Sequence, residues 1–190
     1  MKGRNKLSAL VASGMLLASL APARAAAPAD LRELNVATVQ QRLREGTLTT
    51  RALTDYYLDR IARHDRTGLS LRSVLAVHPE VTAQADARDA ARADGQPRGP
   101  LYGVPVLIKD NVDTFDMPTT AGSLALANHR PAKDAFIVAR LRAAGALILG
   151  KTNLSEWANF RSTRSSSGWS GVHGQTRNPY DPARTPCGSS

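Results

Sequence analysis

Two stretches of this 190-residue sequence carry residues that could do chemistry. The stretch GALILGKT, residues 145–152, matches the pattern G-x-x-x-x-G-K-[ST], in which loop N–H groups and a lysine hold nucleotide phosphates. The second is Lys109, which follows the apolar run VPVLI and precedes Asp110. A lysine in this setting can form an ion pair with a carboxylate, or it can lose its proton and act as a general base. From these residues alone the ion pair is the simpler explanation, and both alternatives stay open.

Lysine is scarce in this sequence, which makes each lysine in an apolar setting informative. After Ala25, 18 of the 21 basic residues are arginine, and the lysines are Lys109, Lys133 and Lys151. Arginine stays protonated in proteins, whereas a buried lysine can become neutral.

The first residues have the pattern of a secretory signal peptide. A basic start is followed by the uncharged apolar run LSALVASGMLLASL and then by APARA, with Ala23 and Ala25 in an A-x-A arrangement. We therefore expect residues 1–25 to be a signal peptide and residues 26–190 to be exported, to the periplasm or the medium, with no membrane association after cleavage. Cys187 is the single cysteine, so no internal disulfide is expected.

Charge and composition argue against several classes of partner. The net charge is +9, and residues 1–25 hold four basic and no acidic residues, which leaves +5 for residues 26–190. The basic residues are spread along the chain without interleaved aromatic residues, so no nucleic-acid interface is predicted. The four histidines lack zinc-ligand spacing, so we expect no metal and no cofactor.

Periodicity predicts alternating helices and strands. Helices are expected over 37–46, from Thr49 or Thr50 to about His64, over 80–95 and over 134–145; strands are expected at 73–77, 104–108 and 146–149. Apolar stripes should run through Leu53, Tyr57 and Ile61, and through Ile137, Leu141 and Ala144. The two later strands are apolar throughout, as strands covered on both faces are, so an α/β layered fold is predicted.

This order of elements argues against nucleotide binding. The four variable positions of the apparent motif form a strand, whose N–H groups would be used by the sheet, and Gly150 and Lys151 would follow that strand. Asn153 and Glu156 have the spacing of a capping box, which predicts a short helix over 154–160.

A family resemblance rests on five stretches that occur in order: GPLYGVPVLIKDNVDT, TTAGSLAL, DAFIVARLRAAGALILGKTNLSEWANF, GWSGVHGQTRNPYDP and PCGSS. Over residues 30–190 the sequence resembles the amidase signature family, and within it most resembles bacterial peptide amidases, which remove the C-terminal amide of peptides. The resemblance implies an α/β fold with a mixed central sheet covered by helices.

The resemblance also implies a Ser–Ser–Lys triad and an amide substrate, small or peptidic. Its lysine matches Lys109, and its bridging serine, which carries a cis peptide bond, matches Ser189. Its nucleophilic serine and oxyanion-hole backbone lie in a later glycine-rich segment. Residues 26–190 are therefore expected to be the N-terminal part of an amidase domain that ends before the nucleophile, inactive alone and poorly folded alone.

Other polar residues have simpler explanations than catalysis. Ser190 is expected to support its loop, Ser165 to Ser167 to form a flexible loop, and Lys151 to be an ion-pair partner. Glu156 is expected to cap a helix. Thr119, Thr120 and Ser123 either line the cleft, as the resemblance would allow, or form turns.

Two other functions remain to be weighed against an exported amidase. A non-catalytic remnant or binding domain could use the same scaffold without a nucleophile, and the DNA beyond codon 190 would discriminate between the two. The amidotransferase component that acts on tRNA is another relative of the family, but its work is cytoplasmic and the signal peptide argues against it.

Overall fold

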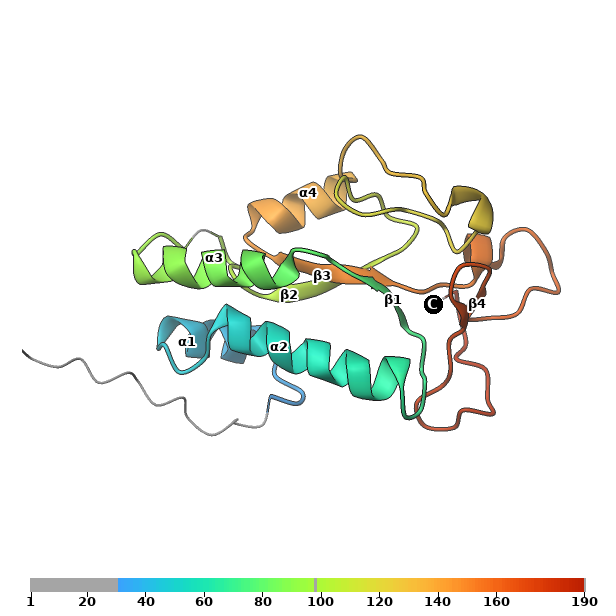
Figure 1. Ribbon diagram of the computed structural model, residues 1–190, viewed down its shortest axis with the longest axis horizontal. Helices are drawn as coiled ribbons and strands as arrows, with labels where there is room; N and C mark the ends of the chain where they lie inside the picture. The colour runs from blue at the N-terminus through green and yellow to red at the C-terminus, as the bar shows by residue number, and fades with distance from the viewer. Residues whose placement is uncertain (1–30, 98, 190) are drawn as a thin grey trace, which may run out of the picture.

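A computed structural model of the chain describes residues 31–97 and 99–189 (Figure 1). The expected signal peptide and Ser190 lie outside the described residues. Within those ranges, no helix has the length and apolar character needed to cross a membrane.

The centre of the molecule is a three-stranded mixed sheet, as predicted. Its strands are β1 (Val74–Val77), β2 (Pro105–Lys109) and β3 (Leu147–Thr152), in the order β1-β3-β2. The central strand β3 runs parallel to β2 and antiparallel to β1. The parallel pairing brings the carboxyl ends of β2 and β3 to one edge of the sheet, and Lys109 lies at that edge.

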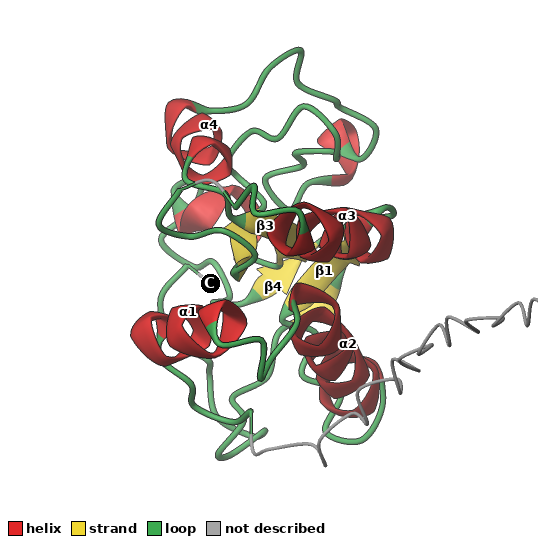
Figure 2. Cartoon of the chain, turned by 90° about the vertical axis from the view of Figure 1, so that its left-hand side faces the viewer, coloured by secondary structure: helices red, strands yellow, loops and turns green. Residues whose placement is uncertain are grey.

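Helices cover both faces of this sheet (Figure 2). On one face lie α1 (Val36–Arg44), α2 (Thr50–Arg60), which continues as a π-helical turn over Ile61–Arg66, and α3 (Val81–Ala93). Their apolar side chains form two clusters, one around Leu43 and Leu53 and one joining Val81 to Leu147 and Leu149. On the other face, α4 (Phe136–Ala143) packs Val138 against Ile108 and Ile148.

Local sequence signals explain where these helices begin. The side chains of Asn35 and Thr49 accept hydrogen bonds from the backbone N–H groups of Thr38 and Ala52, which satisfies donors at the starts of α1 and α2. The predicted stripe of Leu53, Tyr57 and Ile61 faces the core, as expected.

The stripe predicted for α4 is wrong in part. Val138 is fully buried and Leu141 packs against the same cluster, whereas Ile137 is 55% exposed. The buried face therefore runs through Val138 and Leu141, spaced i, i+3, with Val138 in place of the predicted Ile137.

Two predictions around the apparent phosphate motif need correction. β3 extends to Thr152, so Gly150 and Lys151 lie within the strand and not after it. Residues 154–160 do not form an α-helix, because Glu156–Asn159 is a 3₁₀ turn in which Trp157 and Ala158 have φ of 51° and 52°. A strand occupies the four variable positions of the motif, as predicted.

Strand packing explains the glycine of the apparent motif. A Cβ atom on Gly150 would lie 2.2 Å from the carbonyl oxygen of Ala76 on β1, at a position where the β1–β3 register shifts. Gly150 therefore lets two strands approach closely.

Two short elements lie in the loops outside the central sheet and its helices. Leu124–Leu126 is a 3₁₀ turn, and β4 (Trp169–Ser170) pairs antiparallel with β5 (Gly174–Gln175). Residues 165–167 lie in irregular loop and turn, as their composition predicts.

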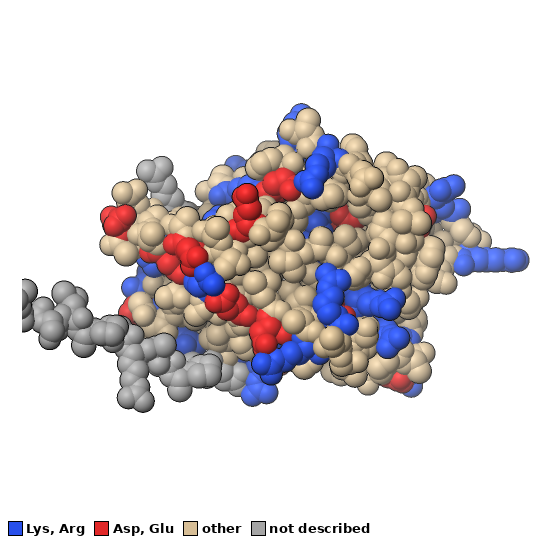
Figure 3. Space-filling model, viewed as in Figure 1, with Lys and Arg blue, Asp and Glu red and all other residues tan. Residues whose placement is uncertain are grey.

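Figure 3 shows how the charges lie on one face of the molecule. Acidic side chains cross α2 and α3 in an oblique row, and Arg51 of this region forms ion pairs with Asp55 and Asp86. Basic side chains are scattered over the same view, with one group toward the end that holds β4.

Gly150→Ala should lower the free energy of unfolding by about 1–3 kcal/mol, the usual cost of overpacking, because the added methyl meets fixed backbone. Gly171→Ala is the matched control, since its Cβ would meet the movable end of the Glu156 side chain. Urea denaturation of both variants measures the difference. Equal stability of the two variants would contradict the steric explanation.

Candidate active site

Lys109 and Ser189 lie together, although 80 positions separate them in the sequence. The Lys109 Nζ atom is 2.6 Å from the Ser189 Oγ atom, and the amine donates this hydrogen bond. Lys109 ends β2 at the carboxyl edge of the sheet, as expected from the apolar run that precedes it. A neutral amine could instead accept the serine proton at the same separation, which is the geometry that a base and a proton relay require.

One implication of the resemblance is not met. No cis peptide bond occurs among the described residues, so the bond between Gly188 and Ser189 is trans. A cis bond to a non-proline residue costs about 3–4 kcal/mol and needs surrounding structure to enforce it. The contact between Ser189 and Lys109 forms without it.

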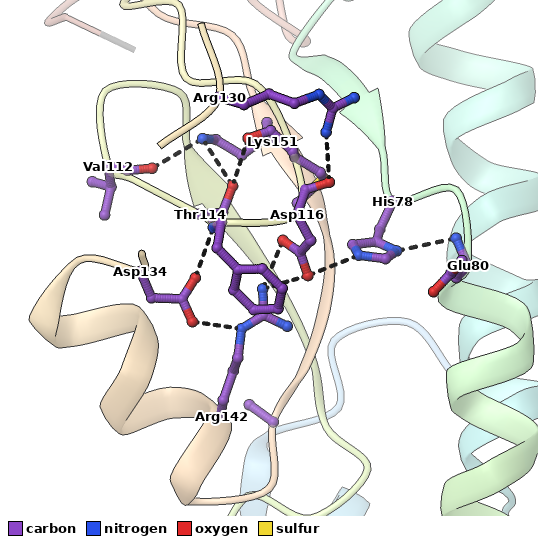
Figure 4. Close-up of polar contacts among 12 residues, drawn as sticks. His78, Glu80, Val112, Thr114, Asp116, Arg130, Asp134, Arg142 and Lys151 are labelled. Carbon is purple, nitrogen blue, oxygen red and sulfur yellow. Dashed lines mark hydrogen bonds and ion pairs between the residues drawn. The ribbon is translucent and has the colours of Figure 1, made fainter. Parts of the chain in front are cut away.

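Lys151 is the second lysine near this edge, and it is fully buried. Its ammonium donates to the carbonyl oxygens of Val112 (2.9 Å) and Pro118 (3.2 Å) and to the Thr119 hydroxyl (2.9 Å). It also forms an ion pair with Asp110 at 3.3 Å. Figure 4 shows the ammonium enclosed by the loop that follows β2. Lys151 is therefore an ion-pair partner, as predicted.

The two lysines lie on opposite faces of the sheet. Lys151 pairs with Ile108 in the parallel register, and Lys109 pairs with Thr152. Successive residues of a strand point to opposite faces, so Lys109 and Lys151 do so too. Burial lowers the pKa of Lys151, and the negative charge of Asp110 acts in the opposite direction.

Asp110 fixes the start of the loop that runs from β2 to Ser123. Its buried carboxylate accepts hydrogen bonds from the Thr120 hydroxyl and the Thr120 N–H group, and the Thr120 hydroxyl accepts from the Gly122 N–H group. The hydroxyls of Thr119 and Thr120 are thus engaged inside the loop, which favours the turn explanation over cleft lining.

A second polar group, the half-buried Asp116, joins this loop to His78 and to α4. Asp116 accepts hydrogen bonds from His78 at 3.0 Å and from Arg142 at 2.7 Å, and Arg142 also pairs with Asp134 (Figure 4). Burial alone would raise the pKa of Asp116, but the hydrogen bond from His78 and the charge of Arg142 outweigh it and lower that pKa. The Arg142 guanidinium also stacks on the Phe115 ring at 4.9 Å.

The predicted capping box does not form. The Asn153 side-chain amide donates to the carbonyl oxygens of Arg72 and Gly174, and so it links β3 to distant loops. The Glu156 carboxylate accepts from the Gly171 N–H group at 3.0 Å. Both side chains therefore hold tertiary contacts, and the backbone turns left-handed where a helix was expected.

Within residues 31–97 and 99–189, no group of three His, Cys, Asp or Glu side chains is placed to hold a metal ion.

Comparison with known proteins identifies the family. The amidase family model matches residues 52–190, most of the chain. The chain belongs to the amidase family. Its structure resembles that of the peptide amidase from Stenotrophomonas maltophilia, with a TM-score of 0.81 and 54% identity over 83% of this chain. An amidase family protein from Bacillus anthracis has a TM-score of 0.75 and is 41% identical over 80% of this chain.

Curated relatives include proteins with two kinds of name. A putative amidase of Arthroderma benhamiae is 40% identical over 85% of this chain, and a glutamyl-tRNA(Gln) amidotransferase component from Salinispora arenicola is 42% identical over 84%. The chain spans 27% and 31% of these two proteins and 32% of the peptide amidase. Its mixed α/β structure is the N-terminal part of the amidase-signature fold.

Lys151→Met should lower the free energy of unfolding by about 3–5 kcal/mol, because it leaves the buried Asp110 carboxylate without its partner. Lys133→Met is the control, since Lys133 is exposed. Chemical denaturation of the two variants gives the comparison, and a Lys151→Met protein as stable as Lys133→Met would refute the role given to this lysine.

Proposed function

We propose that this chain provides the base and the proton relay of an amide hydrolase that acts on C-terminal amides of peptides. The single observation that carries the proposal is the 2.6 Å contact between Lys109 Nζ and Ser189 Oγ. The substrate class is supported by 54% identity to a protein named peptide amidase, of which one structure contains the competitive inhibitor chymostatin.

In this mechanism Lys109 is neutral and accepts the proton of Ser189, while Ser189 accepts the proton of a nucleophilic serine. The nucleophile, which the family resemblance places after residue 190, attacks the amide carbonyl and forms a tetrahedral intermediate. The carbon–nitrogen bond then breaks, and ammonia leaves with the proton returned through Ser189. Water hydrolyses the resulting serine ester by the same route, so that one amide and one water give one acid and one ammonia.

Lys151 and Asp110 have no chemical part in these steps. Both are fully buried, they form an ion pair with each other, and the loop over 112–120 encloses them, so neither can reach a substrate. Their contribution is to keep the carboxyl edge of the sheet in one conformation.

The test uses the gene product with whatever sequence its gene encodes beyond codon 190, a peptide with a C-terminal amide, and ammonia release as the readout. Lys109→Ala should lower kcat by about 10²–10⁴, as loss of a general base does, and Ser189→Ala should also be severe. Lys133→Ala, an exposed lysine, is the control. Near-normal kcat for Lys109→Ala would show that the role assignment is wrong.

A second peptide tests the substrate class. It has a glutamine side chain and no C-terminal amide, so the glutamine side chain is its only source of ammonia. Preference for the C-terminal amide supports a peptide amidase. Ammonia from glutamine alone would favour the amidotransferase relatives. No ammonia from either peptide would favour a non-catalytic domain. We expect the 190-residue chain alone to release none, because the family resemblance places the nucleophile and the oxyanion donors in another segment.

Export is part of the proposal. Residues 1–25 have the charge, the apolar run and the A-x-A site of a signal peptide, and we expect cleavage after Ala25. Intact-mass measurement of the periplasmic or secreted protein tests this, and a product that still begins at Met1 would contradict it.

A further inference from the structure

Ser155 contacts the segment that carries Ser189 through both its backbone and its side chain. Its N–H group donates to the Ser189 carbonyl oxygen at 3.0 Å. Its hydroxyl donates to the Gly188 carbonyl oxygen at 3.4 Å and accepts from the Gly168 N–H group at 2.6 Å. A serine hydroxyl has one proton to donate and lone pairs to accept with, so one hydroxyl can make both bonds.

We propose that Ser155 is a positioning residue for Ser189, which keeps the relay hydroxyl within reach of Lys109. The inference rests on the proposed function, in which Ser189 carries the proton. Ser155 touches no reacting atom, and it acts by fixing two consecutive carbonyl groups of the backbone that bears Ser189.

The segment before Ser189 needs such an anchor. Cys187 and Gly188 both have left-handed backbone, with φ of 65° and 63°. A left-handed non-glycine residue is an uncommon conformation that surrounding contacts must hold in place. Cys187 is exposed, so core packing does not hold it. Ser155, which binds the carbonyl groups of Gly188 and Ser189, is fully buried and can therefore anchor this segment.

Ser155 is well placed to be rigid because its neighbours are fixed to the sheet and the loop. Asn153 donates its N–H group to the Ser73 carbonyl oxygen at 2.8 Å, beside β1. Trp157 donates its N–H group to the Ala121 carbonyl oxygen at 2.8 Å, and Ala121 donates its N–H group to the Asp110 carbonyl oxygen. The same backbone therefore joins Ser189 to the residue that follows Lys109.

Asn159 gives a second, weaker restraint on the same carbonyl. Its side-chain amide donates to Gly188 O at 3.4 Å, from a residue whose φ is 67°. Glycine adopts this conformation readily, so Asn159→Gly removes the side chain without disturbing the backbone. This variant tests the restraint on Gly188 without touching the buried Ser155.

The first experiment measures kcat and KM on a peptide amide with the gene product. Ser155→Ala should lower kcat by about tenfold to a hundredfold, because a small misplacement of a reacting group has an effect of this size, and KM should change little. Ser162→Ala, an exposed serine of the following loop, is the matched control and should behave as wild type. A kcat for Ser155→Ala equal to that of the control would overturn the proposal.

A double mutant separates positioning from general loss of structure. In a Ser189→Ala background, Ser155→Ala should cause no further loss of kcat, because the group that it positions is gone. A variant that merely unfolds part of the protein would reduce activity by the same factor in both backgrounds, and that result would refute a positioning role.

The second experiment needs no activity. Cys187 is exposed and lies two residues before Ser189, so a nitroxide attached to it in the gene product, with any cysteine encoded beyond codon 190 replaced by serine, reports the motion of this segment. Ser155→Ala and Asn159→Gly should both increase nitroxide mobility in the electron paramagnetic resonance spectrum, with Ser162→Ala unchanged.

Together the two experiments distinguish failure of this inference from failure of the proposed function. If no variant and no wild-type protein hydrolyses an amide but mobility rises as expected, the function is wrong and the restraint by Ser155 stands. If the enzyme is active and mobility is unchanged in both variants, the inference is wrong. If Ser155→Ala lowers the melting temperature of the protein, the nitroxide mobility of Asn159→Gly decides whether the restraint on Gly188 exists.

Discussion

The parallel pairing of β2 with β3 is the constraint on which the site depends. It brings the carboxyl ends of these two strands to one edge of the sheet, and its register places Lys109 beside Thr152 and Ile108 beside Lys151. Because side chains alternate along a strand, one lysine is directed to each face. A register shift of one residue between these two strands would direct both lysines to the same face, and one of them would lose its present surroundings.

The buried Lys151 connects the sheet to the loop that follows β2. An ammonium removed from water must find acceptors and a negative charge, and Lys151 finds them in the loop over 110–119. The loop then passes through Thr120 and Ala121, whose contacts reach Asp110 and Trp157. Two residues before Trp157 stands Ser155, which contacts the backbone of Ser189. The buried ion pair and the exposed end of the site are thus parts of one hydrogen-bonded structure.

The elements with a clear period could be predicted from the sequence, and the loops could not. Strands at 73–77, 104–108 and 146–149 were recognisable from continuous apolar runs. The last of these covers the four variable positions of the apparent phosphate motif. Asn153 and Glu156 have the spacing of a capping box, but their side chains form hydrogen bonds with the backbone of Arg72 and Gly171 instead. Local spacing cannot weigh partners that lie 15 or 81 positions away. Lys109 was recognisable from the apolar run before it, and the resemblance added its catalytic role, whereas Ser189 was found by the resemblance alone. Asp110 stands next to Lys109 in the sequence, but nothing in the sequence pointed to Ser155.

The scarcity of lysine also has a physical explanation in these two environments. Around Lys151, carbonyl and hydroxyl oxygens converge on a single nitrogen from several directions, which suits a compact ammonium with three donors. A planar guanidinium would present its donors in a fixed fork, which does not match acceptors that converge on a single nitrogen. At Lys109 the requirement is different, because the proposed role needs a group that can be neutral, and arginine in proteins cannot lose its proton. After Ala25 the chain uses arginine for positive charge except at the exposed Lys133 and at these two positions. At Lys151 the converging acceptors suit an ammonium, and at Lys109 the proposed role needs a group that can lose its proton.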